Sequence, residues 1–175
     1  GTATKIHPNE LTAALLSFLF VFIIMTAYSI LKPVRDALGG DWGEVGLAMT
    51  WTVNFVFSVI AVSAYGAALS MFRFRYVVPG VYGFFSLTFL ALWLVTVNVA
   101  EPVLFNKIFY VWVSVFALFH LSVFWSFMAD VYTKDQASRL FGFIAAGTSL
   151  GAIMGPSLTI LLSDSIGNNG LMLVS

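Results

Sequence analysis

Long hydrophobic segments along this chain are separated by short polar segments. Five stretches contain no charged residue, and they cover residues 11–31, 45–72, 76–100, 108–129 and 140–163. Each is at least as long as the roughly 20 residues that a helix needs to cross a hydrocarbon core of about 30 Å. None shows the two-residue alternation of a membrane β-strand. A helix satisfies its own backbone hydrogen bonds in lipid, so the pattern predicts five transmembrane helices.

The polar breaks between these segments are short, so consecutive helices are expected to be antiparallel neighbours. The sequence predicts an all-α membrane protein, a polytopic helix bundle that forms a single transmembrane domain over residues 1–175. The expected helices cover about 11–36, 45–72, 76–98, 106–129 and 138–163. A sixth apolar stretch begins near residue 170, and the chain stops within it. We therefore interpret the chain as part of a longer protein.

Composition excludes several classes of protein. Apolar residues make up 60% of the chain and charged residues only 9%, whereas soluble domains carry about 25% charged residues. A chain of this length has too much surface for such a deficit in water, so the lipid bilayer is the expected partner. The net charge is zero, and nothing indicates a nucleic-acid partner. Cysteine is absent, which excludes disulfides, thiolate metal sites and cysteine nucleophiles.

Lysine and arginine predict the orientation in the membrane, because cytoplasmic ends carry more of them. One set of helix ends carries five basic residues: Lys5, Arg73, Arg75, Lys134 and Arg139. The opposite ends carry three: Lys32, Arg35 and Lys107. The expected orientation therefore has the N-terminus in the cytoplasm.

Polar residues gather where the first apolar segment ends. If the helix continues past Leu31, Tyr28, Lys32 and Arg35 share one face at spacings of four and seven, with Asp36 beside them. One interpretation is an interfacial anchor, in which both cations extend toward water and Asp36 pairs with Lys32. The other is a substrate-binding site for an anionic solute, because arginine binds phosphate or carboxylate through a planar fork and lysine through a point charge. The residues leave both interpretations open.

Glycines recur every four residues in the last long segment, at Gly147, Gly151 and Gly155, and Pro156 follows them. This spacing leaves a groove along one helix face, against which another helix can pack closely. We expect a helix-packing motif here. If the chain is a transporter, we expect two helices to move at this contact during transport.

Other polar residues give weaker signals. His120 lies in the middle of an apolar segment and is a candidate polar relay, although a relay needs a carboxylate partner. Asp135 and Arg139 are spaced four apart and are expected to pair. No phosphate-binding loop, zinc-ligand spacing or catalytic triad is present. We therefore expect neither an enzyme nor a cofactor or metal site.

Three segments resemble the ATP:ADP antiporter (nucleotide transporter) family and its bacterial relatives. They are residues 28–38, 124–130 and 139–156, which match the end of helix 1 and the passage from helix 4 to helix 5. The family is related to the major facilitator superfamily. The resemblance implies the N-terminal six-helix half of such a transporter, in the inner (cytoplasmic) membrane of a bacterium. It also implies that Arg35 takes the place of a basic residue that serves the substrate.

Two positions differ from the family pattern. The nucleotide translocases carry an acidic residue early in helix 4, where this chain has Val113, and the superfamily's turn between helices 2 and 3 has aspartate where this chain has Ser70. Two functions therefore stay open. One is secondary transport of a small anionic solute, with a nucleotide as one candidate, by alternating access. The other is a non-transporting subunit that assembles partner membrane subunits.

Overall fold

The structure is a computed structural model that describes residues 10–40, 42–72, 74–98 and 103–175. Within these residues the regular structure is helical throughout: α1 (Leu11–Gly39), α2 (Gly43–Met71), α3 (Phe74–Asn98), α4 (Val103–Val131) and α5 (Lys134–Val174). Each contains a span long and apolar enough to cross a membrane. The fold is thus an all-α membrane helix bundle, as the charge-free segments predict. Lys5, Arg73 and the side chain of Arg75, which contribute to the expected orientation, lie outside the described part.

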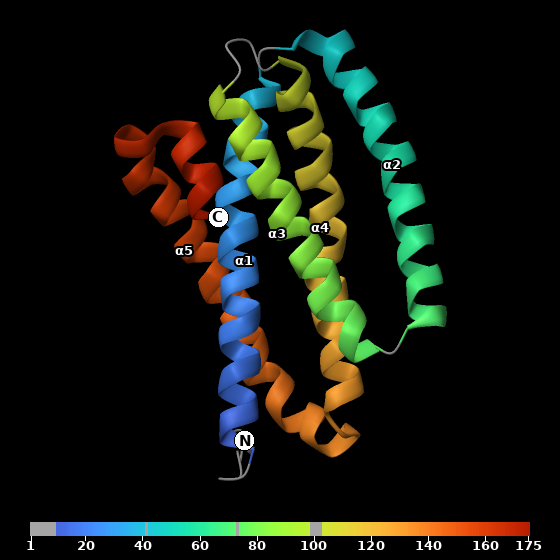
Figure 1. Ribbon diagram of the computed structural model, residues 1–175. Helices are drawn as coiled ribbons and strands as arrows, with labels where there is room; N and C mark the ends of the chain where they lie inside the picture. Colours follow the sequence, from blue (N-terminus) through green and yellow to red (C-terminus); the bar gives the residue numbers. More distant parts are fainter. Residues whose placement is uncertain (1–9, 41, 73, 99–102) are drawn as a thin grey trace.

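The helices run alternately up and down, as Figure 1 shows. α1 begins at the end of the bundle where α4 ends and α5 begins, and it ends where α2 and α4 begin. α1 packs most extensively against α5 and next against α4, while α2 and α3 both pack mainly against α4. α2 is the most loosely attached helix, since Thr50 is its one buried residue among those described.

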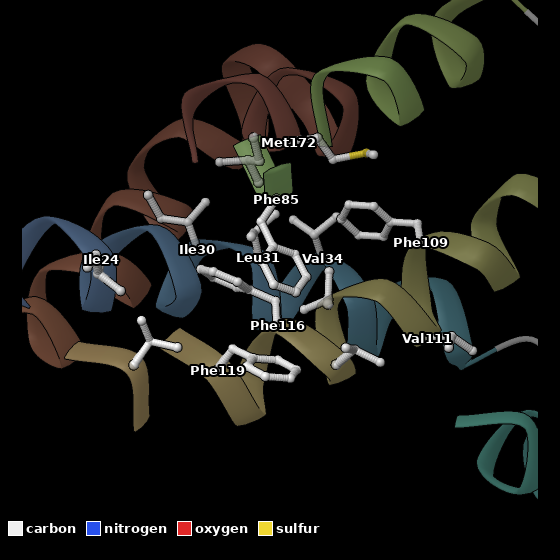
Figure 2. Close-up of a cluster of buried hydrophobic side chains, with 14 of the residues drawn as sticks. Ile24, Ile30, Leu31, Val34, Phe85, Phe109, Val111, Phe116, Phe119 and Met172 are labelled. Atoms are coloured by element: carbon white, nitrogen blue, oxygen red, sulfur yellow. The ribbon is translucent and has the colours of Figure 1, made fainter. Parts of the chain in front are cut away.

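The antiparallel contact of α1 with α4 positions the candidate site. Three pairs of side chains mark its length, starting with a 2.9 Å hydrogen bond between the hydroxyl groups of Ser17 and Tyr132. Tyr28 then lies against His120, and Arg35 against Ser114. Between these polar pairs, apolar side chains of α1, α3 and α4 converge on one cluster (Figure 2).

The chain changes direction near its end at Gly167. This residue has φ 60° and ψ −174° inside α5, a conformation that side chains with a Cβ rarely adopt. The following turn comes back to the bundle, where Leu171 and Met172 are buried in the cluster of Figure 2. The apolar residues near 170 are therefore part of the packed core.

Candidate functional site

Arg35 is held at the contact of α1 with α4. α1 stays helical through Pro33 as far as Gly39, so the spacing of Tyr28, Lys32 and Arg35 is helical throughout. The Arg35 side chain is only 16% exposed. Its Nε and Nη2 donate to Asp36 Oδ1 at 2.9 and 2.7 Å.

The other contacts of Arg35 come from α4. Nη1 of Arg35 donates to Ser114 Oγ at 3.3 Å, and the guanidinium carbon lies 5.2 Å from the centre of the Tyr110 ring. Tyr110 and Ser114 are four residues apart, so they share one face of α4. Sequence reasoning missed both, because neutral tyrosine and serine at this spacing are common in apolar helices.

Lys32 and Asp36 complete the cationic cluster. Asp36 pairs with Arg35 and not with Lys32, the partner considered from the sequence. The long guanidinium fork reaches the neighbouring carboxylate directly. Lys32 is exposed and makes no ion pair with any residue that the structure describes. The cluster therefore keeps one uncompensated positive charge beside a paired one.

His120 lies one to two helical turns deeper along the same contact. The residue is only 5% exposed, and its ring stacks on the Tyr28 ring with centroids 4.2 Å apart. Nδ1 is 2.8 Å from the Ala117 carbonyl oxygen, to which it can donate only as N–H. In the neutral ring Nε2 is then an acceptor, and it has no hydrogen-bond partner among the described residues. The neighbours that bind or stack on this ring are backbone and aromatic groups, and the carboxylate that a relay requires is not among them.

The glycine series of α5 lies against α1. A Cβ built on Gly147 would lie 2.7 Å from the Phe18 carbonyl oxygen, and one on Gly151 would lie 2.7 Å from that of Phe22. At Gly155 a Cβ would collide with the Ser29 side chain. The two backbones are therefore in contact along this face, and any side chain larger than hydrogen would force them apart. Pro156, next to the last glycine, is exposed.

An ion pair that the sequence did not predict joins the start of α1 to the start of α5. Arg139 donates from Nη1 and Nη2 to the two carboxylate oxygens of Glu10 at 3.0 and 2.9 Å, and Gln136 donates to the same carboxylate at 3.1 Å. The Glu10 side chain is only 10% exposed. Local spacing had pointed to Asp135 as the partner of Arg139. Glu10 lies 129 residues away in sequence, so only the packing of the helices could identify it.

A cavity of about 410 Å³ lies between α1, α3, α4 and the end of α5. Its lining is mostly apolar, with Leu31, Phe85, Phe116 and Met172 among its residues. Neither Lys32 nor Arg35 lines it. The cationic cluster is therefore separate from this cavity.

Comparisons with protein-family models, with curated proteins and with solved structures give no match to this chain. The case for a function therefore rests on the geometry described above and on the sequence segments at residues 28–38, 124–130 and 139–156.

Proposed function

We propose that this chain is part of a secondary transporter that binds a small anionic solute at Lys32 and Arg35. One observation carries the proposal: Arg35 is fixed at the contact of α1 with α4, while Lys32 beside it is exposed and unpaired among the described residues. A membrane cation costs several kcal/mol unless it meets water or a counter-charge. Asp36 compensates Arg35, so an anion from solution is the natural counter-charge for Lys32.

The surroundings of Arg35 favour a binding site over an interfacial anchor. An anchoring side chain extends into water and needs no fixed geometry. Arg35 instead has hydrogen bonds to Asp36 and Ser114 and an aromatic ring beside it. Such contacts hold the guanidinium fork in one orientation before any ligand arrives, which lowers the entropic cost of binding.

The solute and the transport mechanism can be proposed in more detail. The resemblance of residues 28–38 and 139–156 to nucleotide transporters makes a nucleotide, exchanged by alternating access across a bacterial inner membrane, the first solute to test. The close contact of α1 with α5 supports a movement in which this helix pair shifts as one body, because backbones in direct contact deform little.

Counterflow of labelled solute tests the proposal. Protein reconstituted in vesicles loaded with ATP should take up labelled ADP or another anionic solute. Arg35→Ala should weaken solute binding about tenfold or more, because a hydrogen bond to a charged group contributes roughly 1.5–3 kcal/mol. Arg35→Lys keeps the charge but loses the fork, and should retain part of the activity.

Lys134→Ala is the matched control, because Lys134 is also basic and lies exposed at the opposite end of the bundle. Its uptake should equal that of the parent. Equal losses at Arg35 and Lys134, or no loss at Arg35, would show that the cluster is only an anchor.

The scaffold function remains the second candidate, and the exposure of α2 favours it. Most large apolar side chains of this helix are exposed, and Thr50 is its one buried residue among those described. A subunit that holds partner membrane subunits would use such a face. Absence of uptake with a panel of anionic solutes, together with partner helices cross-linked to α2, would favour this function over transport.

A further inference from the structure

A groove lies between α2 and α4. It encloses about 400 Å³. Its apolar walls are formed by Met49, Val53 and Phe57 from α2 and by Leu104, Ile108 and Val111 from α4. Met49 and Phe57 are eight residues apart, so the α2 wall is about 12 Å long. Since α2 packs loosely, no other part of the described chain fills this space.

Lys107 is the one charged residue among the described residues that line the groove. It belongs to the second turn of α4, close to the end of the bundle where α1 finishes. Lys107 Nζ lies 5.8 Å from the centre of the Trp42 ring, and the structure gives it no ion pair with any described residue. Trp51 lies at the same end, where its Nε1 donates to Tyr110 Oη at 3.2 Å. Tryptophans mark the level at which lipid headgroups meet the hydrocarbon core.

We propose that the α2–α4 groove binds an anionic phospholipid, with an acyl chain between the helices and the headgroup phosphate at Lys107. The apolar walls and the one cation among the described lining residues match the two parts of such a molecule. Basic pockets between transmembrane helices bind anionic headgroups on the same principle.

The lining argues against two other occupants. Close helix packing in membranes uses small residues, and this chain uses glycines for that purpose on the α1–α5 face; the α2–α4 groove instead has bulky walls. A free phosphate would need several donors. The other described side-chain donors in the lining are already engaged: the Thr50 hydroxyl donates to the Gly46 carbonyl oxygen at 2.8 Å, and Trp112 Nε1 donates to Thr88 Oγ1 at 2.7 Å.

Native mass spectrometry of the purified chain, titrated with phosphatidylglycerol or phosphatidylcholine, tests the site. The parent should retain phosphatidylglycerol preferentially. Lys107→Gln should reduce that preference about fivefold, the effect of one lysine near an anionic headgroup. Lys107→Arg should restore it. Lys134→Gln, at the opposite end, should behave as the parent.

Val53→Trp tests the apolar half of the site, because the indole would fill the groove. It should reduce retention of both lipids, and an unchanged melting temperature would show that the variant is folded. An unchanged preference in Lys107→Gln, or unchanged retention in Val53→Trp, would overturn the proposal. Two further outcomes would overturn it. One is that inorganic phosphate displaces the bound lipid as effectively as added phosphatidylglycerol does. The other is that Val53→Trp dissociates a dimer of the chain while lipid retention stays unchanged. None of these measurements depends on transport, so the lipid site and the solute site can fail separately.

Discussion

Arg35 and Lys107 carry the same charge at the same end of the bundle, yet their surroundings differ. Arg35 has a carboxylate, a hydroxyl and an aromatic ring within reach, and most of its side chain is covered. Lys107 has the Trp42 ring and an apolar groove. A fixed fork suits a solute that must be bound in one orientation, whereas a flexible ammonium suits a headgroup that needs only a counter-charge.

Ser114→Ala should weaken the solute site modestly. The hydroxyl accepts one 3.3 Å hydrogen bond from Arg35, which is long for such a bond. We expect a loss of about 1 kcal/mol, equivalent to about fivefold in solute affinity. Ser122→Ala, an exposed serine on the same helix, should leave affinity unchanged. If both variants bind solute as the parent does, Ser114 does not position the guanidinium.

At the scale of helices, the contact of α1 with α5 is the tightest in the bundle. It combines the glycine face in the membrane with the Glu10–Arg139 ion pair at one end. Direct backbone contact gives dispersion energy over many atoms, and the ion pair fixes the rotation of the two helices about their axes. Each feature can be tested separately.

Gly151→Leu should destabilise the protein far more than Gly142→Leu. The new side chain at residue 151 would meet the Phe22 carbonyl oxygen and the Met25 Cβ, which lies 2.9 Å from the Cβ position. A side chain at residue 142 of the same helix would enter open space. Overpacking costs roughly 1–3 kcal/mol, so the melting temperature in detergent should fall clearly for the first variant and hardly for the second. Equal melting temperatures would contradict the close contact.

Glu10→Gln should lower the melting temperature by several degrees, because it leaves the Arg139 guanidinium without its carboxylate. Glu44→Gln removes an exposed acid from the first turn of α2 and should have little effect. A double-mutant cycle with Arg139→Gln measures the coupling directly. If the effects of Glu10→Gln and Arg139→Gln are additive, the ion pair does not stabilise the fold.

At the scale of the whole molecule, the alternation of the helices decides which polar residues share a membrane side. The start of α1 meets the start of α5 through Glu10 and Arg139, while the last turns of α1 meet the first half of α4 at Arg35 and Ser114. Lys134 and Arg139, the described members of the larger basic set, therefore lie at the opposite end of the bundle from Lys32, Arg35 and Lys107. The charge rule predicts that the end of the bundle with Lys134 and Arg139 faces the cytoplasm.

Single-cysteine labelling of intact cells tests this orientation, and the absence of native cysteine removes any background. Gly40→Cys, exposed at the end of α1, should react with an impermeant maleimide from outside. Lys134→Cys, exposed at the start of α5, should react only after lysis. The reverse pattern would mean that the N-terminus faces outward.

The membrane class and the approximate helices could be predicted from the sequence alone. Charges are so costly in hydrocarbon that their absence over more than 20 residues is enough to identify a span. Spacing of four residues also identified the glycine face of α5, and spacings of four and seven identified the shared face of Tyr28, Lys32 and Arg35. These features depend on local geometry, which sequence spacing encodes directly.

The helix faces that meet could not be predicted from the sequence and become known from the packing. α2 and α4 are apolar around most of their circumference, and such helices carry little sequence signal for the side that faces protein or lipid. The contacts of Arg35 with Ser114, of Tyr28 with His120 and of Glu10 with Arg139 each join residues about 80–130 positions apart. They depend on the rotation of each helix about its own axis, which the packing of all neighbours determines together.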